Sequence, residues 1–258
     1  MKNLIHPTAI IDDSAELSKD VAVGPFSVIG PNVKIASGTR IASHVLVARN
    51  TQIGKDNQIY SFASVGEDPQ DLKFSGEETW LEIGDRNRIR ESCTIHRGTV
   101  QDKGLTYIGN DNLLMAYTHI AHDCQLGDDV ILSTQATIAG HVKIDSHAII
   151  GGLAGVHQFC HIGSYCMIGG GSIILKDVPA YIMTGGNPAT AFGMNYEGMK
   201  RRGFDKETIA SLKEAYKIVY RNQLTLEKAI EQLEAMPVSK ELNIFIHSLK
   251  KAPRGIIR

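Results

Sequence analysis

The sequence predicts a mainly β fold, a parallel β-helix prism of hexapeptide repeats, followed by a C-terminal α-helical domain. Three observations support this class. Aliphatic residues recur at every sixth position, small residues recur two places before them, and aromatic residues make up only 6% of a chain that is 43% apolar. A core with so few large rings must be built from aliphatic and small side chains.

The six-residue repeat is unbroken over two long stretches. Eleven aliphatic residues follow one another from Ile5 to Val65, and twelve follow from Ile108 to Ile174. A period of six fits neither an amphipathic helix, with about 3.6 residues per turn, nor the simple alternation of a strand. It fits short strands joined by tight turns. Glycine often follows the aliphatic residue, and we expect it to serve turns that need a positive φ.

The four cysteines follow the same pattern. Each occupies the small inward position two residues before an aliphatic one: Cys93, Cys124, Cys160 and Cys166. A free cysteine in such a place behaves as a small buried apolar residue. We therefore expect structural thiols with no disulfide, catalytic or metal-binding role.

Two insertions interrupt the repeat, at about residues 66–80 and 97–106. A solenoid extrudes insertions as loops, often on its binding face. In the first insertion Asp71, Lys73 and Phe74 combine polar groups with an apolar anchor, which favours a function for this loop. The second insertion fits a functional loop and a tolerated surface loop equally well.

The repeat stops after residue 179, and capping residues then predict helices. These helices run from Asp205 to about Asn222, from Thr225 to about Ala235, and from Ser239 to about Lys250. We therefore divide the chain into a β-helix of residues 1–187 and a helical domain of residues 188–258. A polar cap of this kind closes the end of a repeat stack.

The helical domain is basic. From Tyr196 onward the chain has 13 basic and 8 acidic residues, whereas the preceding part has 14 basic and 20 acidic residues. The adjacent Arg201 and Arg202 suit a diphosphate, because a guanidinium group can hold phosphate oxygens at two points. A solvated basic helix end explains the same cluster equally well.

Composition excludes several classes of protein. The net charge of −1 argues against a dedicated nucleic-acid-binding protein. Acidic residues at Asp12, Asp13 and Glu16 lie where a signal peptide needs an apolar run. No stretch approaches the roughly 18 apolar residues that a membrane span requires. We therefore expect a cytoplasmic protein without stable membrane insertion.

Histidines gather on the outside of the predicted coil. Asp123 and His141 are separated by three hexapeptides, which make one full coil, so they should stack beside His122. The chain around them is poor in charge, with only Lys143 and Asp145 between residues 130 and 175. Its outward positions hold Ile149, Leu153, Phe159, Tyr165, Met167 and Ile173. So large an apolar face must meet a partner or an apolar ligand.

Four stretches carry a specific resemblance: GEDPQDLKF, MAYTHIAHDCQLGDDV, GGLAGVHQF and NYEGMKRRGF. With the repeat, they resemble the sugar-nucleotide O-acyltransferases of lipid A synthesis, a family of left-handed β-helix acyltransferases. The resemblance implies the left hand of the coil and a homotrimer with three sites between neighbouring prisms. It implies transfer of an (R)-3-hydroxyacyl chain from acyl carrier protein to the 3-hydroxyl of UDP-N-acetylglucosamine, with a 3-amino sugar nucleotide as an open alternative acceptor.

The resemblance also implies catalytic roles. His122 would be the general base, Asp123 would hold its imidazole, and the backbone N–H of Gly140 would polarise the thioester carbonyl. Because the thioester is already activated, no enzyme nucleophile, metal or cofactor is needed.

Binding roles come from the same resemblance. Gln70, Asp71, Lys73 and His119 would surround the sugar; His141, Gln158, Arg201 and Arg202 would hold the phosphates and acyl hydroxyl; Asn195 and Glu197 would hold the nucleoside; His96 and His157 would line the site. Gly170 would end the acyl groove and leave it deep enough to bury a chain of about fourteen carbons. The basic tail would receive the acidic acyl carrier protein.

Three alternatives share parts of this pattern. Trimeric carbonic anhydrase-like proteins bind zinc through three histidines, which His119, His122 and His141 could imitate. A related sugar-nucleotide N-acyltransferase needs an extra nucleotide-binding domain before the repeats, which here begin at Ile5. A non-catalytic scaffold explains the coil but not the pairing of His122 with Asp123.

Overall fold

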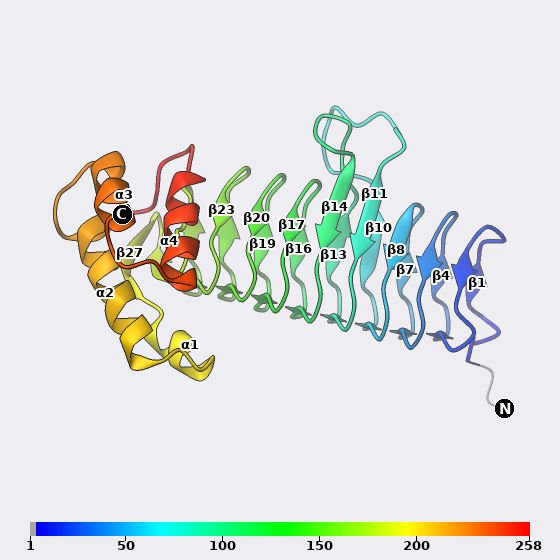
Figure 1. Ribbon diagram of the computed structural model, residues 1–258. Helices are drawn as coiled ribbons and strands as arrows, with labels where there is room; N and C mark the ends of the chain where they lie inside the picture. The colour runs from blue at the N-terminus through cyan, green and yellow to red at the C-terminus, as the bar shows by residue number, and fades with distance from the viewer. Residues whose placement is uncertain (1–3) are drawn as a thin grey trace.

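The structure is a computed structural model that describes residues 4–258. In it a long coil carries helices on its C-terminal end (Figure 1). Within these residues three sheets form the sides of the coil, and successive strands along the chain enter the sheets in rotation. The predicted fold class, a parallel β-helix prism with a C-terminal helical region, is confirmed. Residues 1–3 of the predicted β-helix lie outside the described part.

Nearly every strand is very short and pairs in parallel with the strands one coil before and after it. The first sheet contains β1 (Ile10–Ile11), β4 (Val28–Ile29), β7 (Leu46–Val47), β10 (Ser64–Glu67), β13 (Thr94–His96), β16 (His119–Ile120), β19 (Thr137–Ile138), β22 (Gly155–Val156) and β25 (Ile173–Ile174). The second contains β2 (Glu16–Leu17), β5 (Lys34–Ile35), β8 (Thr51–Ile53), β11 (Trp80–Ile83), β14 (Leu105–Ile108), β17 (Gln125–Leu126), β20 (Lys143–Ile144) and β23 (His161–Ile162). The third contains β3 (Ala22–Val23), β6 (Arg40–Ile41), β9 (Gln58–Ile59), β12 (Arg88–Ile89), β15 (Leu113–Leu114), β18 (Ile131–Leu132), β21 (Ile149–Ile150), β24 (Met167–Ile168), β26 (Ile182–Gly186) and β27 (Ala189–Met194).

The chain turns at three corners of the prism. We call corner 1 the turn from the first sheet to the second, corner 2 the turn from the second to the third, and corner 3 the turn from the third back to the first. Two turn residues separated by three hexapeptides in an uninterrupted part of the coil lie at the same corner, in neighbouring coils.

The core consists of stacked aliphatic rows. Ile120 pairs with Ile138, and Ile138 with Val156, so each inward residue lies on its counterpart one coil away. These side chains are almost fully buried, and each such burial stabilises the fold by about 1.5–3 kcal/mol. The four cysteines are also buried and free of disulfides, which confirms their structural placement within residues 4–258.

Both insertions leave the coil at corner 1. Val65 pairs with Ile95 and Ile95 with Ile120, so each of these two coils is longer than the regular coil that joins Ile120 to Ile138. Loop 1 (residues 68–79) and loop 2 (residues 97–104) extend from the same side of the prism (Figure 1). The predicted insertions are slightly too long, because residues 66–67 belong to β10, Trp80 begins β11, and residues 105–106 belong to β14.

The expected role of the repeated glycines holds at Gly66, which has a φ of 86°, but is wrong at the other glycines that follow the aliphatic positions. The positive φ at a corner belongs to a residue two places later, as at Phe26 (φ 58°) after Gly24 and Asp111 (φ 58°) after Gly109. A Cβ atom on Gly24 would lie 2.7 Å from the backbone of Ala42 in the next coil. At positions such as Gly24, glycine is therefore needed for the close approach of neighbouring coils and not for its backbone freedom.

The C-terminal part begins with a hairpin and ends with helices. Strands β26 and β27 pair antiparallel across the predicted boundary between residues 187 and 188. The helices are α1 (Tyr196–Arg201), α2 (Lys206–Tyr220), α3 (Leu226–Glu234) and α4 (Lys240–Lys250). The predicted caps Asp205, Thr225 and Ser239 each accept a hydrogen bond from a backbone N–H in the first turn of their helix, which confirms these three helices. Helix α1 was not predicted.

The outward apolar residues fall into two groups. Leu153 and Phe159 are 65% and 51% exposed, as the sequence predicts. Tyr165 instead lies between the rings of His147, Tyr181 and Phe204. The helical region of the same chain packs against this half-buried ring, so Tyr165 exposes less of its surface than the sequence predicts.

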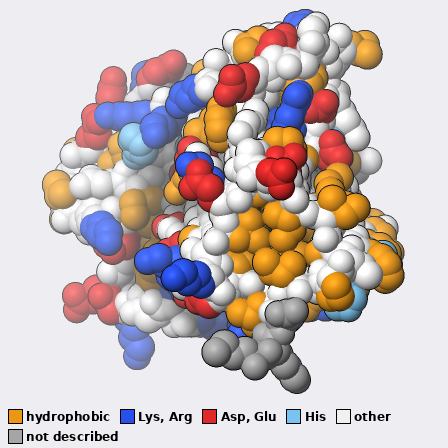
Figure 2. Space-filling model, turned by 90° about the vertical axis from the view of Figure 1, so that its right-hand side faces the viewer, with side chains coloured by type: hydrophobic (Ala, Val, Ile, Leu, Met, Phe, Trp, Pro, Cys, Tyr) orange, Lys and Arg blue, Asp and Glu red, His pale blue; other side chains and the backbone are white. Residues whose placement is uncertain are grey.

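The N-terminal end of the coil differs from the helix-covered end. Figure 2 shows apolar side chains gathered on this end face. Leu4, Ile5 and Ile10, which belong to the first coil, are 42%, 40% and 65% exposed. The aliphatic rows of the core therefore reach the surface at this end.

Candidate active site

The candidate site is built at corner 1, beside both loops. Asp123, His141 and Phe159 occupy the same turn position in three successive coils, with φ values of 60°, 61° and 65°. The ring of Phe159 stacks on that of His141 at a centroid distance of 4.4 Å. The rings of His141 and His122 meet edge to face at 5.0 Å. The spacing of three hexapeptides thus predicted the neighbours of His122 correctly.

His122 and Asp123 form a hydrogen-bonded pair. The His122 Nδ1 atom lies 2.8 Å from Asp123 Oδ2, and the two side chains are 14% and 1% exposed. A carboxylate can accept a hydrogen bond only from a nitrogen that carries a proton, so Nδ1 is the protonated nitrogen. In the neutral ring Nε2 is then left with a lone pair. This is the arrangement in which an acidic group orients a histidine for general-base work.

Loop 2 supplies further donors to Asp123. The backbone N–H of Thr99 lies 2.9 and 3.1 Å from the two carboxylate oxygens, and the Thr99 hydroxyl donates to Oδ2 at 2.6 Å. Burial raises the pKa of Asp123, but the hydrogen bonds from His122 and Thr99 outweigh burial and hold this pKa below its ordinary value. The carboxylate therefore stays ionised. The sequence reading missed Thr99, because no periodic pattern relates a loop residue to a corner in the following coil.

Arg97 connects loop 2 to loop 1. Its guanidinium group is buried and donates to the carbonyl of Gly66 and to the carboxylate of Asp68. The sequence reading missed this residue as well. Thr99 holds loop 2 against Asp123 and Arg97 holds loop 2 to the start of loop 1, so the second insertion is a structural part of the site.

The predicted residues of loop 1 lie at its surface. Gln70 and Lys73 are exposed and Asp71 is half-buried. The Asp71 carboxylate accepts the backbone N–H of Lys73 at 3.0 Å, and its carbonyl accepts that of Phe74 at 3.0 Å. This turn fixes the outer part of the loop.

Two further histidines lie one step away along the first sheet. The rings of His96 and His119 meet edge to face at 5.1 Å, and His119 Nδ1 lies 2.8 Å from the hydroxyl of Thr94. Burial lowers the pKa of both, with neighbouring histidines adding to the effect, and the pKa of His96 falls to about 4. Both rings are therefore neutral near pH 7 and keep positive charge away from His122.

Gly140 and Gln158 occupy the position of His122 in the next two coils, since each follows the preceding residue of the three by three hexapeptides. A Cβ atom on Gly140 would lie 2.7 Å from Cε1 and 2.9 Å from Nε2 of His122. His157 and Gln158 are exposed at the same corner. His141 Nδ1 also lies 3.2 Å from Asp102 of loop 2.

The remaining predicted residues lie at the other two corners. Arg202 contacts His147, which is between β20 and β21 at corner 2, and Asn195 bonds to the carbonyl of Tyr165 at this corner. Glu197 and Arg201 are on α1 beside them. Gly170 is exposed at corner 3, where a Cβ atom would lie 3.2 Å from the carbonyl oxygen of Gly152. A single chain therefore does not bring these residues to His122.

A metal ion would compete with the hydrogen bonds of the pair. Among the described residues, ligand atoms of His122, Asp123 and His141 lie within 4.8 Å of one another and could hold a cation. Coordination through Oδ2 would displace the Thr99 hydroxyl and the His122 N–H from that oxygen. The arrangement is thus better suited to proton transfer than to coordination.

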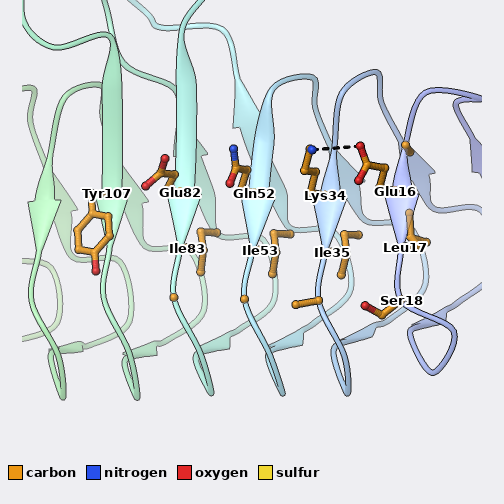
Figure 3. Close-up of a pocket in the computed structure, with 14 residues that line it drawn as sticks. Glu16, Leu17, Ser18, Lys34, Ile35, Gln52, Ile53, Glu82, Ile83 and Tyr107 are labelled. Atoms are coloured by element: carbon orange, nitrogen blue, oxygen red, sulfur yellow. Dashed lines mark ion pairs between the residues drawn. The ribbon is translucent and has the colours of Figure 1, made fainter.

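Two open grooves follow the second sheet. One, of ≈ 820 Å³, extends from His141 and Phe159 at corner 1 past Lys143 and His161 toward the C-terminal segment. The other, of ≈ 830 Å³, lies nearer the N-terminus and is shown in Figure 3. Its side chains Glu16 and Lys34 form a 3.0 Å ion pair but are 70% and 53% exposed, as expected of a solvated surface pair. Only the first groove reaches the candidate site.

Comparison with known proteins identifies the family. Residues 177–257 match the family model described as UDP N-acetylglucosamine O-acyltransferase, domain 2, and residues 105–140 match bacterial transferase hexapeptide repeats. The chain is 54% identical over 257 residues to the acyl-[acyl-carrier-protein]–UDP-N-acetylglucosamine O-acyltransferase of Stutzerimonas stutzeri, covering 99% of this chain and 100% of the relative. It belongs to this O-acyltransferase family. The chain is therefore an acyltransferase, and the readings as a carbonic anhydrase-like enzyme or a non-catalytic scaffold are set aside.

Solved structures of the O-acyltransferase family agree. LpxA from Acinetobacter baumannii superposes with a TM-score of 0.97 at 56% identity, covering 99% of this chain and 100% of that one. The UDP-N-acetylglucosamine O-acyltransferase (LpxA) from Moraxella catarrhalis also gives 0.97, at 51% identity and the same coverage. None of the helices within residues 4–258 is both long and apolar enough to cross a membrane.

Replacing Thr99 by valine tests the contribution of loop 2. Valine keeps the shape and the backbone N–H but removes the 2.6 Å hydroxyl bond to Asp123. A bond to a charged group is worth about 1.5–3 kcal/mol, so we expect kcat to fall roughly tenfold with a small change in KM. Thr79→Val is the matched control, because its buried hydroxyl has no partner within the described residues and its loss should not lower activity. Equal kcat values for the two variants would show that Thr99 does not support the pair.

Proposed function

We propose that this protein transfers an (R)-3-hydroxyacyl chain from acyl carrier protein to the 3-hydroxyl of UDP-N-acetylglucosamine, as the first step of lipid A synthesis and without a covalent enzyme intermediate. The observation that carries the mechanism is the buried His122–Asp123 pair, with Nε2 of His122 beside Gly140. The substrates are supported by the relatives, which are acyl-[acyl-carrier-protein]–UDP-N-acetylglucosamine O-acyltransferases.

The chemistry requires one base and one oxyanion site. His122 Nε2 accepts the proton of the sugar hydroxyl while the hydroxyl oxygen attacks the thioester carbonyl. The backbone N–H of Gly140 donates to the oxyanion that forms. When the C–S bond breaks, the thiolate of the carrier takes the proton from His122, whose charged form Asp123 stabilises. Imidazole changes its charge near neutral pH, and such a base accelerates a reaction by about 10²–10⁴.

We further propose a homotrimer with sites between neighbouring prisms. The supporting observation is that predicted site residues occupy three corners of one prism, whereas a substrate must meet them together. In this arrangement loop 1 and corner 1 of one chain face corners 2 and 3 of its neighbours. The sugar then meets Asp71, Lys73 and His119.

The remaining ligands follow from the same arrangement. His141, Gln158, Arg201 and Arg202 take the phosphates and acyl hydroxyl, and Asn195 and Glu197 take the nucleoside. The basic helical region suits docking of the acidic acyl carrier protein. Dependence on this carrier supports a cytoplasmic location.

The acyl-chain preference tests the function. We expect transfer to UDP-N-acetylglucosamine from (R)-3-hydroxyacyl carrier proteins of graded length to be fastest near about fourteen carbons, since each buried methylene contributes about 0.8 kcal/mol. Gly170→Met should shift the optimum to shorter chains, because the added side chain would fill the end of the acyl groove that we propose at corner 3. Mass spectrometry of the product measures both, with the 3-amino sugar nucleotide as a second acceptor. Absence of transfer at every length contradicts the function, and a ten-carbon optimum contradicts only the role of Gly170.

A further inference from the structure

A stack of side chains at corner 2 supports helix α1. The ring of His147 stacks on Tyr165 at 4.6 Å, and Tyr165 stacks on Tyr181 at 5.3 Å. Phe204, just beyond α1, meets both tyrosine rings edge to face. Asn195 donates from its side chain to the carbonyl of Tyr165 at 3.0 Å and from its backbone to that of Tyr181 at 2.7 Å. These contacts fix the position of the short helix along the coil.

Arg202 lies at the end of α1 against this stack. Its Nη1 atom is 2.8 Å from Nδ1 of His147, and its guanidinium carbon lies 5.7 Å from the centre of the Tyr165 ring. Arginine has no acceptor, so the imidazole nitrogen must accept and the ring of His147 must be neutral. The neighbouring Lys200 is different, because it pairs with Glu197 at 2.9 Å on the helix surface.

We propose that His147 is a positioning residue for the sugar nucleotide: its neutral imidazole holds one edge of the Arg202 guanidinium and leaves the remaining N–H groups directed at the diphosphate. This inference rests on the proposed function, because it takes Arg202 as a ligand of the nucleotide. Anchoring a long flexible side chain before the substrate arrives lowers the entropy lost on binding.

The charges around His147 make its contact with Arg202 sensitive to pH. Burial lowers the pKa of His147 and the charge of Arg202 lowers it further, whereas Asp129 and Asp128 oppose the shift. Asp129 Oδ2 lies 3.4 Å from Nδ1 of His147. Tyr165 is a further titratable side chain, and its ring stacks on the imidazole. The imidazole is therefore neutral at neutral pH. In acid it becomes protonated, can no longer accept from Arg202, and repels it.

Two substitutions separate the role of the acceptor nitrogen from that of the aromatic ring. The new residues, phenylalanine and asparagine, already occur at this turn position in other coils. His147 has φ 67°; Phe26, Phe62 and Phe159 adopt similar angles, as do Asn32 and Asn50. His147→Phe therefore keeps the stacking surface and removes the acceptor. His147→Asn keeps an acceptor oxygen near the place of Nδ1 but cannot be protonated.

The test measures steady-state kinetics and calorimetric binding of UDP-N-acetylglucosamine between pH 5.5 and 8. We expect Arg202→Ala and His147→Phe each to raise KM for the nucleotide about tenfold with kcat within about twofold, as for loss of a hydrogen bond to a charged group. His147→Asn should stay within about twofold of the native KM and lose the weakening in acid. His147→Phe in the Arg202→Ala background should add nothing.

The outcomes distinguish this inference from the function on which it rests. If Arg202→Ala weakens binding and His147→Phe does not, or if Arg202→Ala has no effect, the positioning role is overturned. A native chain that transfers no acyl group overturns the proposed function, while calorimetric binding still reports whether His147 and Arg202 act together. Thermal unfolding checks that each variant is folded, and His147→Asn provides the conservative rescue.

Discussion

Replacement of His122 by alanine is expected to abolish most of the activity, with kcat lowered by about 10²–10⁴. The physical reason is the position of the ring: Nδ1 is bound to Asp123 at 2.8 Å, so only Nε2 can take the proton of an attacking hydroxyl. The change does not alter the residues at corners 2 and 3 that we propose as nucleotide and acyl-chain ligands. We therefore expect KM for both substrates to change much less than kcat, as for a group that acts in the transition state.

The fold should survive this change. His122 is 14% exposed at a turn and does not contribute to the aliphatic rows of the core. Asp123 keeps its bonds from Thr99, so the buried carboxylate is not left without donors. His44→Ala is a matched control, since His44 is also a histidine at a turn, where its ring lies 5.2 Å from that of Phe26 and 5.1 Å from that of Phe62, but at corner 3 and outside the groove that reaches the site. A His122→Ala variant as active as this control would show that His122 is not the base.

The repeat explains why so much of the coil is predictable. Inward positions are determined by a strict period, and each regular coil consists of three hexapeptides, so the sequence alone places His141 over Asp123. The caps Asp205, Thr225 and Ser239 are equally local signals. What is periodic or local in the chain can be predicted from the chain.

Three features could not be predicted, for different physical reasons. Thr99 reaches Asp123 through an aperiodic loop, so no spacing relates the two. Helix α1 is very short and contains Gly198, which is a weak signal; a Cβ there would lie 2.3 Å from the side chain of its cap, Asn195. The role of the repeated glycines depends on contacts between coils, which a single repeat does not contain. Gly24 illustrates this, since its neighbour Ala42 is one coil away.

Replacement of Gly140 by alanine tests the site by displacing the ring of His122 instead of removing it. The backbone of Gly140 does not adopt a positive φ, so alanine is not strained by its own conformation. Its Cβ atom would lie 2.7 Å from Cε1 and 2.9 Å from Nε2 of His122, closer than real Cβ contacts. The imidazole must then rotate or move, which breaks its alignment with Asp123 and occupies the space of the acceptor hydroxyl. We expect kcat to fall by at least about 10².

The same variant separates two roles of Gly140. Alanine keeps the backbone N–H, so a loss of activity reports the displacement of His122 and not the loss of an oxyanion donor. If both changes act through one ring, Gly140→Ala should lower activity little further in a His122→Ala background, because effects within one catalytic unit are not additive. Gly193→Ala is the control, since a Cβ there meets nothing within 4 Å. Native kcat for Gly140→Ala would mean that the ring can yield without losing its function, and that catalysis does not require the present geometry of Nε2.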